Sequence, residues 1–238
     1  MTQRARIKEA VRATYANLAT GQGCGCGPNN SESGCCGESI IGVEAPDEAV
    51  RLSAGCGNPV DIAPIHEGDT VLDLGSGGGI DVFRASQLVG PKGRVIGVDS
   101  TPEMISKARD IAEKTGYQNV EFRLGEIEHM PIEANYVDLA ISNCVLNLLP
   151  DKLEGFKEIY RVLKPGGKIV IADLTTKTSG RSNLYVDPSS WAACVAGAIS
   201  KEEYLALLTR AGFQNLTTIG PSPSTGLASV TITGSKPA

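Results

Sequence analysis

The sequence predicts an α/β fold in which a mostly parallel sheet is covered by helices on both faces. Apolar, strand-like segments alternate with amphipathic helical segments from about residue 69 onward. Continuous apolar strands are typical of parallel sheets, because both of their faces are buried. A chain of 238 residues, 41% of them hydrophobic, is also long enough to bury a sizeable core without disulfide or metal staples.

Strand and helix signals alternate regularly through the central part of the chain. We expect strands over 71–75, 94–99, 120–124, 136–143 and 168–173, with helices over 81–90, 102–115 and 151–163. Thr101 and Pro102 suit the N-cap and the first position of the second helix. Gly90 and the KPGG segment at 164–167 are expected to end the first and the third helix.

The C-terminal part continues the pattern less regularly. A helical patch is expected around 191–198, followed by a helix over 201–211 that ends at Gly212. Two strand-like segments, 214–219 and 228–233, are joined by a loop rich in Gly, Pro and Ser. We expect this pair to form an antiparallel edge of the sheet.

The N-terminal part is different in character. Apolar residues recur at helical spacing within residues 1–20, which predicts a helix. We expect it to act as a lid or packing helix whose basic residues form a solvated face. Residues 21–45 are rich in Gly, Cys, Ser and Asn and have little to bury, which predicts a mobile loop. The expected organisation is therefore a helix, loop and lid over 1–68, a ligand-binding core over 69–175, and a cap with the last strands over 176–238.

Composition excludes several classes of partner. The net charge is −5 and no basic stripe is present, which argues against nucleic acid or a membrane surface as a partner. No apolar run approaches the length of a membrane span, and the first residues lack the apolar core of a signal peptide. We therefore expect a cytoplasmic protein, in which seven cysteines need a reason other than a disulfide framework.

A glycine-rich turn is the strongest local signal for a ligand site. In VLDLGSGGGID a buried strand runs into a turn that contains Gly75, Gly77 and Gly79 and then opens a helix. Glycine allows the unusual backbone angles of such a turn and the close approach of a bulky ligand. Asp99 ends the next strand, where its carboxylate suits the hydroxyls of a ribose. This pattern predicts a Rossmann-like nucleotide site but does not by itself separate NAD from S-adenosylmethionine.

The wider set of motifs resembles the class I methyltransferases. It comprises Asp73 before the first glycine, GEIEHMPIE (125–133), YVDLAISN (136–143) and LKPGGKIVIAD (163–173). The resemblance implies a class I methyltransferase fold with S-adenosylmethionine bound in the 69–175 core. It places Asp73 near the methionine end, and the cofactor-binding set also includes Gly125, Glu126 and Ile127 at the adenine, and Asn143. A Rossmann-like domain that binds another nucleotide, or none, is the alternative.

Three dispersed cysteines mark the expected acceptor site. Cys56 lies in GCGNP before the glycine motif, Cys144 in SNCVLNL after it, and Cys194 in WAACVAGA. These segments resemble the arsenite S-adenosylmethionine methyltransferases over most of the chain. The resemblance implies that Cys56, Cys144 and Cys194 are thiolates that bind As(III), in an arsenic detoxification activity with no obligatory metal cofactor.

The chemistry of arsenic agrees with these residue types. Trivalent arsenic is thiophilic, and its lone pair can attack a methylsulfonium without a general base. The two histidines, His66 and His129, accordingly lie outside the acceptor segments. The resemblance further implies that As(III) arrives as a thiol conjugate, that cysteine thiols supply two electrons after transfer, and that thioredoxin or glutathione restores them. The candidates for this redox role are Cys24, Cys26, Cys35 and Cys36, whose cluster could alternatively hold zinc or another arsenic atom.

Several interpretations stay open at this point. Each acceptor cysteine, taken alone, also fits a small core residue. Asn147 fits either an acceptor-pocket residue or a helix cap, and Trp191 fits a packed wall or a ligand contact. The alternatives for the whole chain are a small-molecule C- or O-methyltransferase and a metalloid-binding or sensing protein on a methyltransferase fold.

Overall fold

The structure is a computed structural model that describes residues 2–21, 41–177, 191–192, 194–220 and 226–238. Its eight-stranded sheet has the order β3-β2-β1-β4-β5-β8-β7, with β6 beside β5. The strands are β1 Thr70–Leu74, β2 Arg94–Asp99, β3 Val120–Leu124, β4 Val137–Asn143, β5 Leu163–Thr176, β6 Ile199–Ser200, β7 Gln214–Ile219 and β8 Leu227–Ser235.

The sheet is mixed but mostly parallel. Strands β1 to β5 pair in parallel, whereas β8 runs antiparallel to both β5 and β7. The expected Rossmann-like sheet with an antiparallel C-terminal edge is confirmed. Parallel strands end at the same side of a sheet, so the loops after β1, β2 and β4 meet there.

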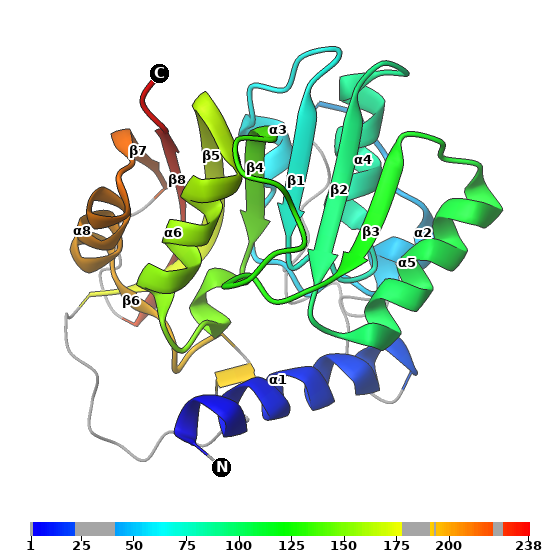
Figure 1. The fold of residues 1–238 in the computed structure, drawn as a ribbon. Helices are drawn as coiled ribbons and strands as arrows, with labels where there is room; N and C mark the ends of the chain where they lie inside the picture. The colour runs from blue at the N-terminus through cyan, green and yellow to red at the C-terminus, as the bar shows by residue number, and fades with distance from the viewer. Residues whose placement is uncertain (1, 22–40, 178–190, 193, 221–225) are drawn as a thin grey trace.

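Helices cover both faces of this sheet (Figure 1). Alternate residues of one strand feed the two cores: Val71 packs with α2 to α5, and Leu72 packs with α6 and α8. The helices are α1 Gln3–Ala19, α2 Asp47–Arg51, α3 Pro59–Ile62, α4 Ile80–Val89, α5 Pro102–Thr115, α6 Lys152–Val162 and α8 Lys201–Ala211, with a 3₁₀ turn, η1, at Leu146–Leu148.

Two expected boundaries need correction. Residues 164–167 do not form a loop between helix and strand, because β5 begins at Leu163 directly after α6 and includes them. Leu163 pairs with Val137 of β4, and Lys236 donates its backbone N–H to Gly167 O at 2.8 Å, so backbone pairing holds this glycine-containing segment in the sheet. In the expected helical patch at 191–198, residues 191–192 are helical, while 194–197 form turns and bends.

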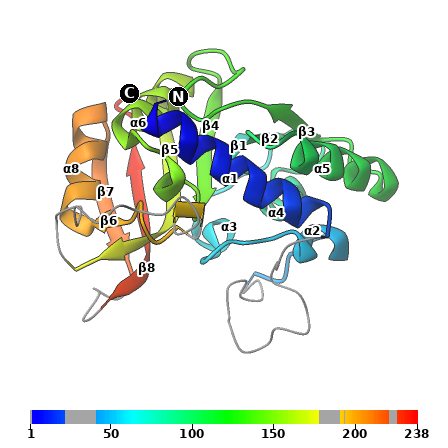
Figure 2. The same cartoon turned by 90° about the horizontal axis from the view of Figure 1, so that it is seen from below.

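Helix α1 lies across the end of the sheet where β1, β2 and β4 terminate, as Figures 1 and 2 show. Its apolar residues Ile7, Val11 and Leu18 are buried, which confirms the predicted helical periodicity. They belong to two small clusters that are separate from the two cores of the sheet. The helix is therefore placed as a cover over the strand ends.

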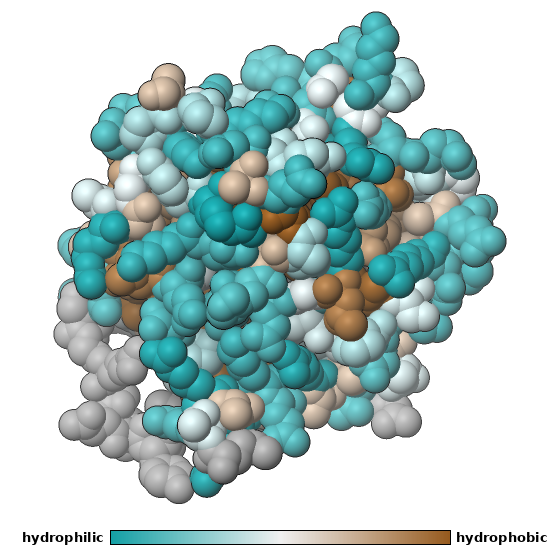
Figure 3. Space-filling view, viewed as in Figure 1, coloured by the Kyte–Doolittle hydropathy of each residue, from teal (hydrophilic) through white to brown (hydrophobic). Residues whose placement is uncertain are grey.

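The face of the molecule shown in Figure 3 is mostly hydrophilic, with apolar side chains gathered in a few patches. Among the residues that the structure describes, no helix combines the length and apolar character needed to cross a bilayer.

Candidate active site

A cavity of about 1040 Å³, part of it open to solvent, lies between α1 and the strand ends. Most of the predicted site residues line it: Asp73, Gly75, Gly77, Asp99, Gly125, Glu126, Ile127, Asn143 and Cys144. The sequence thus identified residues from four separate loops that the fold brings around one cavity.

The glycine turn after β1 has the backbone conformation that the motif predicts. Gly75 and Gly77 have φ values of +67° and +50°, which favour glycine. A Cβ at Gly77 would meet no atom within 4 Å, so the backbone there faces open space that a ligand can fill. Gly79, in contrast, does not line the cavity, and its Cβ would lie 2.7 Å from the ring of Phe122. Its glycine is required for packing of the first turn of α4.

Asp99 is held at the end of β2 by backbone donors. Its carboxylate accepts the N–H of Gly77 at 3.0 Å and the N–H of Thr101 at 2.8 Å. Burial raises the pKa of Asp99, while these hydrogen bonds oppose the shift. Thr101 occupies the N-cap position as predicted, although its side chain caps no N–H of α5.

Asp81 was not among the predicted site residues, yet it joins Asp73 at this cavity. Burial and the neighbouring carboxylates of Asp81 and Asp99 raise the pKa of Asp73 well above its usual value. Burial also raises the pKa of Asp81, and the Oδ1 atom of Asp81 is buried without a hydrogen-bond partner. Three carboxylates around one cavity favour a cationic ligand.

Asn143 uses its side chain to hold the loop that carries Cys56. Its Oδ1 accepts the N–H groups of Cys56 and Gly57 at 3.0 and 3.1 Å. Its Nδ2 donates to Gly57 O at 2.9 Å and to Asp81 Oδ2 at 3.0 Å. Asn143 was predicted to bind the cofactor. The structure places it in the cavity wall but shows its polar atoms engaged in positioning the loop.

The three predicted acceptor cysteines lie close together, and of the three Cys144 lines the cavity. Cys56 and Cys144 form a disulfide with a Cα–Cα separation of 5.8 Å, and the buried, free Cys194 donates its thiol to Cys144 O at 2.8 Å. Cys144 and Cys194 have backbone φ values of 58° and 62°, which residues other than glycine rarely adopt. The predicted juxtaposition is therefore present, with two of the three thiols oxidised.

Cys194 lies in a dry, charged environment. Burial raises the pKa of the Cys194 thiol to about 12, the nearby Asp173 carboxylate adds to the shift, and a hydrogen bond from Tyr15 opposes it. Burial likewise raises the pKa of Asp173 to about 7, although Lys152 and Tyr204 favour its ionised form. Tyr204 donates to Asp173 Oδ2 at 3.1 Å. This buried group behind the acceptor site was not predicted from the sequence.

Asn147 and Trp191 have mainly structural roles. Asn147 is buried in η1 and donates to Leu174 O at 2.7 Å, so it neither lines the cavity nor caps a helix. Trp191 is a packed wall: its Nε1 donates to Leu148 O at 2.9 Å, and its ring packs with Ile7 and Val11 of α1. His66 and His129 are exposed.

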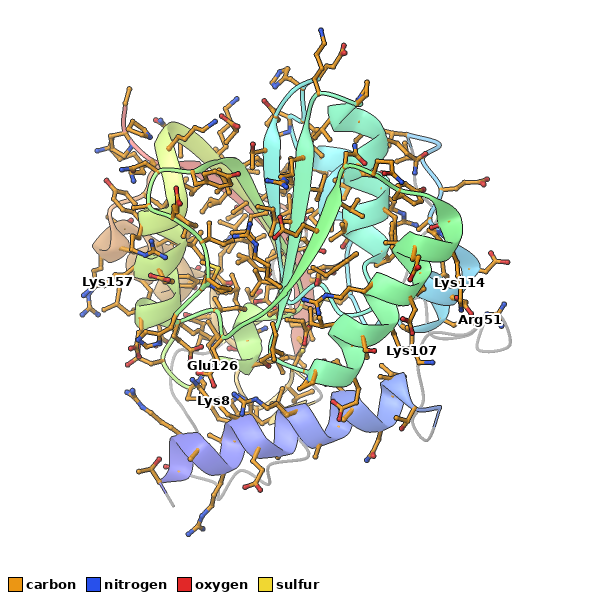
Figure 4. The ribbon with its side chains drawn as sticks, turned by 45° about the vertical axis from the view of Figure 1, so that its right-hand side comes forward. Lys8, Arg51, Lys107, Lys114, Glu126 and Lys157 are labelled. Carbon is orange, nitrogen blue, oxygen red and sulfur yellow. A yellow bond between two sulfur atoms is a disulfide. The ribbon has the colours of Figure 1, made fainter. Side chains whose placement is uncertain are left out.

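The basic residues of α1 are not simply solvated, which corrects the prediction. Lys8 contacts Glu126 at 2.6 Å and Glu128 at 2.9 Å, and Arg12 also contacts Glu126. Figure 4 shows the Lys8 side chain directed toward Glu126. These ion pairs connect α1 to the wall of the cavity.

The predicted redox candidates Cys24, Cys26, Cys35 and Cys36 lie outside the described residues. Their roles therefore stay predictions. Within the described part of the chain, no group of three or more His, Cys, Asp and Glu side chains is arranged to hold a metal ion.

The fold and the glycine-lined cavity at the strand ends fit the methyltransferase class, and a family model described as "Methyltransferase domain" matches residues 65–212, more than half of the chain. Within that class, the chain belongs to the arsenite methyltransferase family. It is 31% identical to the crystal structure of an arsenic(III) S-adenosylmethionine methyltransferase from Chlamydomonas reinhardtii, with a TM-score of 0.69, and the match covers 96% of this chain and 73% of that one.

Curated relatives with the name arsenite methyltransferase agree with this membership. The protein of Halobacterium salinarum is 46% identical over 224 residues, which are 87% of this chain and 57% of that protein. The Homo sapiens protein is 38% identical over 177 residues, covering 70% of this chain and 46% of its own length. The chain thus spans about half the length of the curated relatives it matches.

Proposed function

We propose that this chain transfers a methyl group from S-adenosylmethionine to trivalent arsenic held by Cys56, Cys144 and Cys194. The observation that carries the proposal is that these three cysteines, from segments far apart in the sequence, lie close together, with Cys144 in the wall of the cavity. The names of the relatives support the same acceptor.

The cavity suits S-adenosylmethionine because of its charge and shape. Asp73 and the Oδ1 atom of Asp81, which is buried, accepts no hydrogen bond and lies 3.8 Å from Arg84, favour a cation, and the molecule carries an ammonium and a sulfonium. Asp99 would accept from the ribose hydroxyls, and the open backbone at Gly77 allows close approach. When bound, the cofactor supplies an electrophilic methyl group.

The protein's own contribution is to hold and orient the acceptor. Three cysteine thiols displace the three thiols of an arsenic(III) thiol conjugate, which leave in their protonated form, so the Cys56–Cys144 disulfide must first be opened by an external thiol. Asn143 then fixes the loop of Cys56, while the left-handed backbone at Cys144 and Cys194 fixes the other two. Arsenic would arrive as a thiol conjugate, and thioredoxin or glutathione would serve as the reductant.

Methyl transfer leaves arsenic pentavalent, and two electrons return it to the trivalent state. Two cysteine thiols can supply them by forming a disulfide, which the external thiol then reduces. The disulfide between Cys56 and Cys144 is compatible with such a step. Disulfide mapping after one turnover would show which of Cys24, Cys26, Cys35 and Cys36 forms a disulfide with an acceptor cysteine, or would exclude all four from this redox role.

The test is the formation of S-adenosylhomocysteine with arsenite and a thiol reductant. We expect arsenite-dependent turnover in the wild type and a loss of at least about 100-fold in Cys144→Ser, because one lost ligand misplaces the acceptor. Binding of S-adenosylhomocysteine to the variant serves as the control for an intact fold. Turnover with organic acceptors alone, or arsenite binding without turnover, would contradict the proposal and favour one of the two alternative functions.

A further inference from the structure

One face of α1 contacts both halves of the cavity. Lys8, Arg12 and Tyr15 are four and three residues apart, which places them on the same side of the helix. All three line the cavity, together with Val11 between them. One helix thus borders both the loop of residues 125–127, where the proposed cofactor site holds the adenine, and the part of the cavity that contains Cys144.

On the cofactor side, α1 is attached by charge. Lys8 and Arg12 both pair with Glu126, and Lys8 also pairs with Glu128, whose side chain is only 5% exposed. The hydrogen bond and positive charge of Lys8 hold the pKa of Glu126 below its usual value. Glu126 lies between Gly125 and Ile127 in the cavity wall, so a ligand in this half changes the surroundings of the ion pairs.

On the acceptor side, α1 reaches the cysteines through Tyr15. Tyr15 lines the cavity together with Cys144, and the Cys194 thiol donates to Cys144 O at 2.8 Å. The tyrosine ring also packs against the cluster of Trp191, Val11 and Ile7. The backbone carbonyl oxygen of Trp191 in turn accepts the backbone N–H of Cys194 at 3.0 Å. The segment that carries Cys194 therefore rests directly on α1.

The attachment of α1 is suited to movement. Its buried residues pack in two small clusters, apart from the two large cores of the sheet. Elements with few buried apolar contacts open at a lower free energy than the core does. A shift of the helix would move the Glu126 contacts and the Cys194 contact together.

From this arrangement we infer that α1 couples the two substrate sites, and that Tyr15 is the positioning residue that transmits closure of the helix to Cys194. The inference rests on the proposed function, since it concerns arsenic bound at Cys194. Because coupling between two binding sites is reciprocal, the cofactor product strengthens arsenite binding by the same factor as arsenite strengthens binding of the product.

The experiment is an arsenite titration of the reduced protein, with and without saturating S-adenosylhomocysteine. Trp191, the only tryptophan of the chain, reports binding by its fluorescence because it packs on α1 and contacts Cys194. In the wild type we expect S-adenosylhomocysteine to lower the arsenite Kd by about fivefold or more. In Tyr15→Ala this ratio should fall to near one, because the side chain no longer packs against Trp191.

A charge-matched pair tests the other end of the helix. Lys8→Ala, which loses the contacts to Glu126 and Glu128, should also reduce the ratio, whereas Arg6→Ala, on the exposed side of α1, should leave it unchanged. A ratio of one in the wild type, or an unchanged ratio in Tyr15→Ala, would overturn the coupling alone. A wild type that binds S-adenosylhomocysteine but no arsenite would instead overturn the proposed function, and the coupling with it.

Discussion

Asn143 accepts the backbone N–H of Cys56 at 3.0 Å across 87 residues of sequence, and this bond ties the cofactor wall to the acceptor loop. The side chain of Asn143 makes three further hydrogen bonds, two to Gly57 and one to Asp81. The position of the Cys56 sulfur therefore depends on the side chain of Asn143.

Replacing Asn143 should damage the acceptor site more than the cofactor site. We expect Asn143→Leu to lower arsenite-dependent kcat by about 10- to 100-fold, because the loop of Cys56 loses its anchor. Initial rates at saturating S-adenosylmethionine measure this. The surface substitution Gln118→Leu should leave kcat unchanged, and an equal kcat in both variants would be inconsistent with a positioning role for Asn143.

Asp99 should control cofactor affinity. Asp99→Asn keeps the size of the side chain but points an amide N–H toward the backbone donors of Gly77 or Thr101. We expect the Kd for S-adenosylhomocysteine to rise at least about tenfold, the usual cost of losing a hydrogen bond to a charged group. Isothermal titration calorimetry measures this, with Asp110→Asn on the exposed side of α5 as the control. If the Kd of Asp99→Asn for S-adenosylhomocysteine stays within about twofold of the wild-type value, Asp99 does not contact the cofactor.

Gly79 should matter for stability and not for binding. Gly79→Ala combines a left-handed backbone, at φ +91°, with a Cβ only 2.7 Å from Phe122. We expect the free energy of unfolding to fall by about 2 to 4 kcal/mol, the sum of backbone strain and overpacking. Gly116→Ala, at φ +77° with open space around its Cβ, should cost only about 1 kcal/mol. Urea denaturation gives both values, and equal losses would rule out the packing contribution.

Several site residues could be predicted because their signal is local. Gly75, Gly77 and Asp99 were identified from one strand–turn–helix motif and the following strand. The predicted bounds also agree with the structure for three elements, the helix over 201–211 and the strands over 94–99 and 120–124. The grouping of the three cysteines, however, was implied by family resemblance and not by any local pattern.

Other features depend on contacts between distant segments and leave no mark in the local sequence. The bond of Tyr204 to Asp173 joins α8 to β5, and the bond of Asn143 to Cys56 joins the end of β4 to a loop 87 residues earlier in the chain. The KPGG segment has the composition of a loop, yet pairing with β4 and with the C-terminal residues keeps it in a strand. Asp81 is the exception, since an acidic residue directly after a glycine turn could have been recognised as part of the site.

Asp173 should make stability depend on pH. Its folded pKa of about 7 lies above the usual value of 3.8, so its stabilising contribution is complete below pH 3.8 and is lost as pH rises toward 7. Relative to Asp173→Asn, the wild type should therefore lose about 2 kcal/mol of unfolding free energy between pH 5 and pH 8. Urea denaturation at the two pH values tests this, with Glu113→Gln as an exposed control. A difference that does not change with pH would mean that Asp173 is ionised throughout.

The most direct test of the three-thiolate site is arsenic X-ray absorption spectroscopy of the reduced protein with one equivalent of arsenite. The account predicts an arsenic atom bound by three sulfur atoms in the wild type, and by two sulfurs and one oxygen in Cys194→Ser, because Cys194 is the free thiol beside the Cys56–Cys144 pair. A first shell without sulfur, or an unchanged three-sulfur shell in Cys194→Ser, would contradict it.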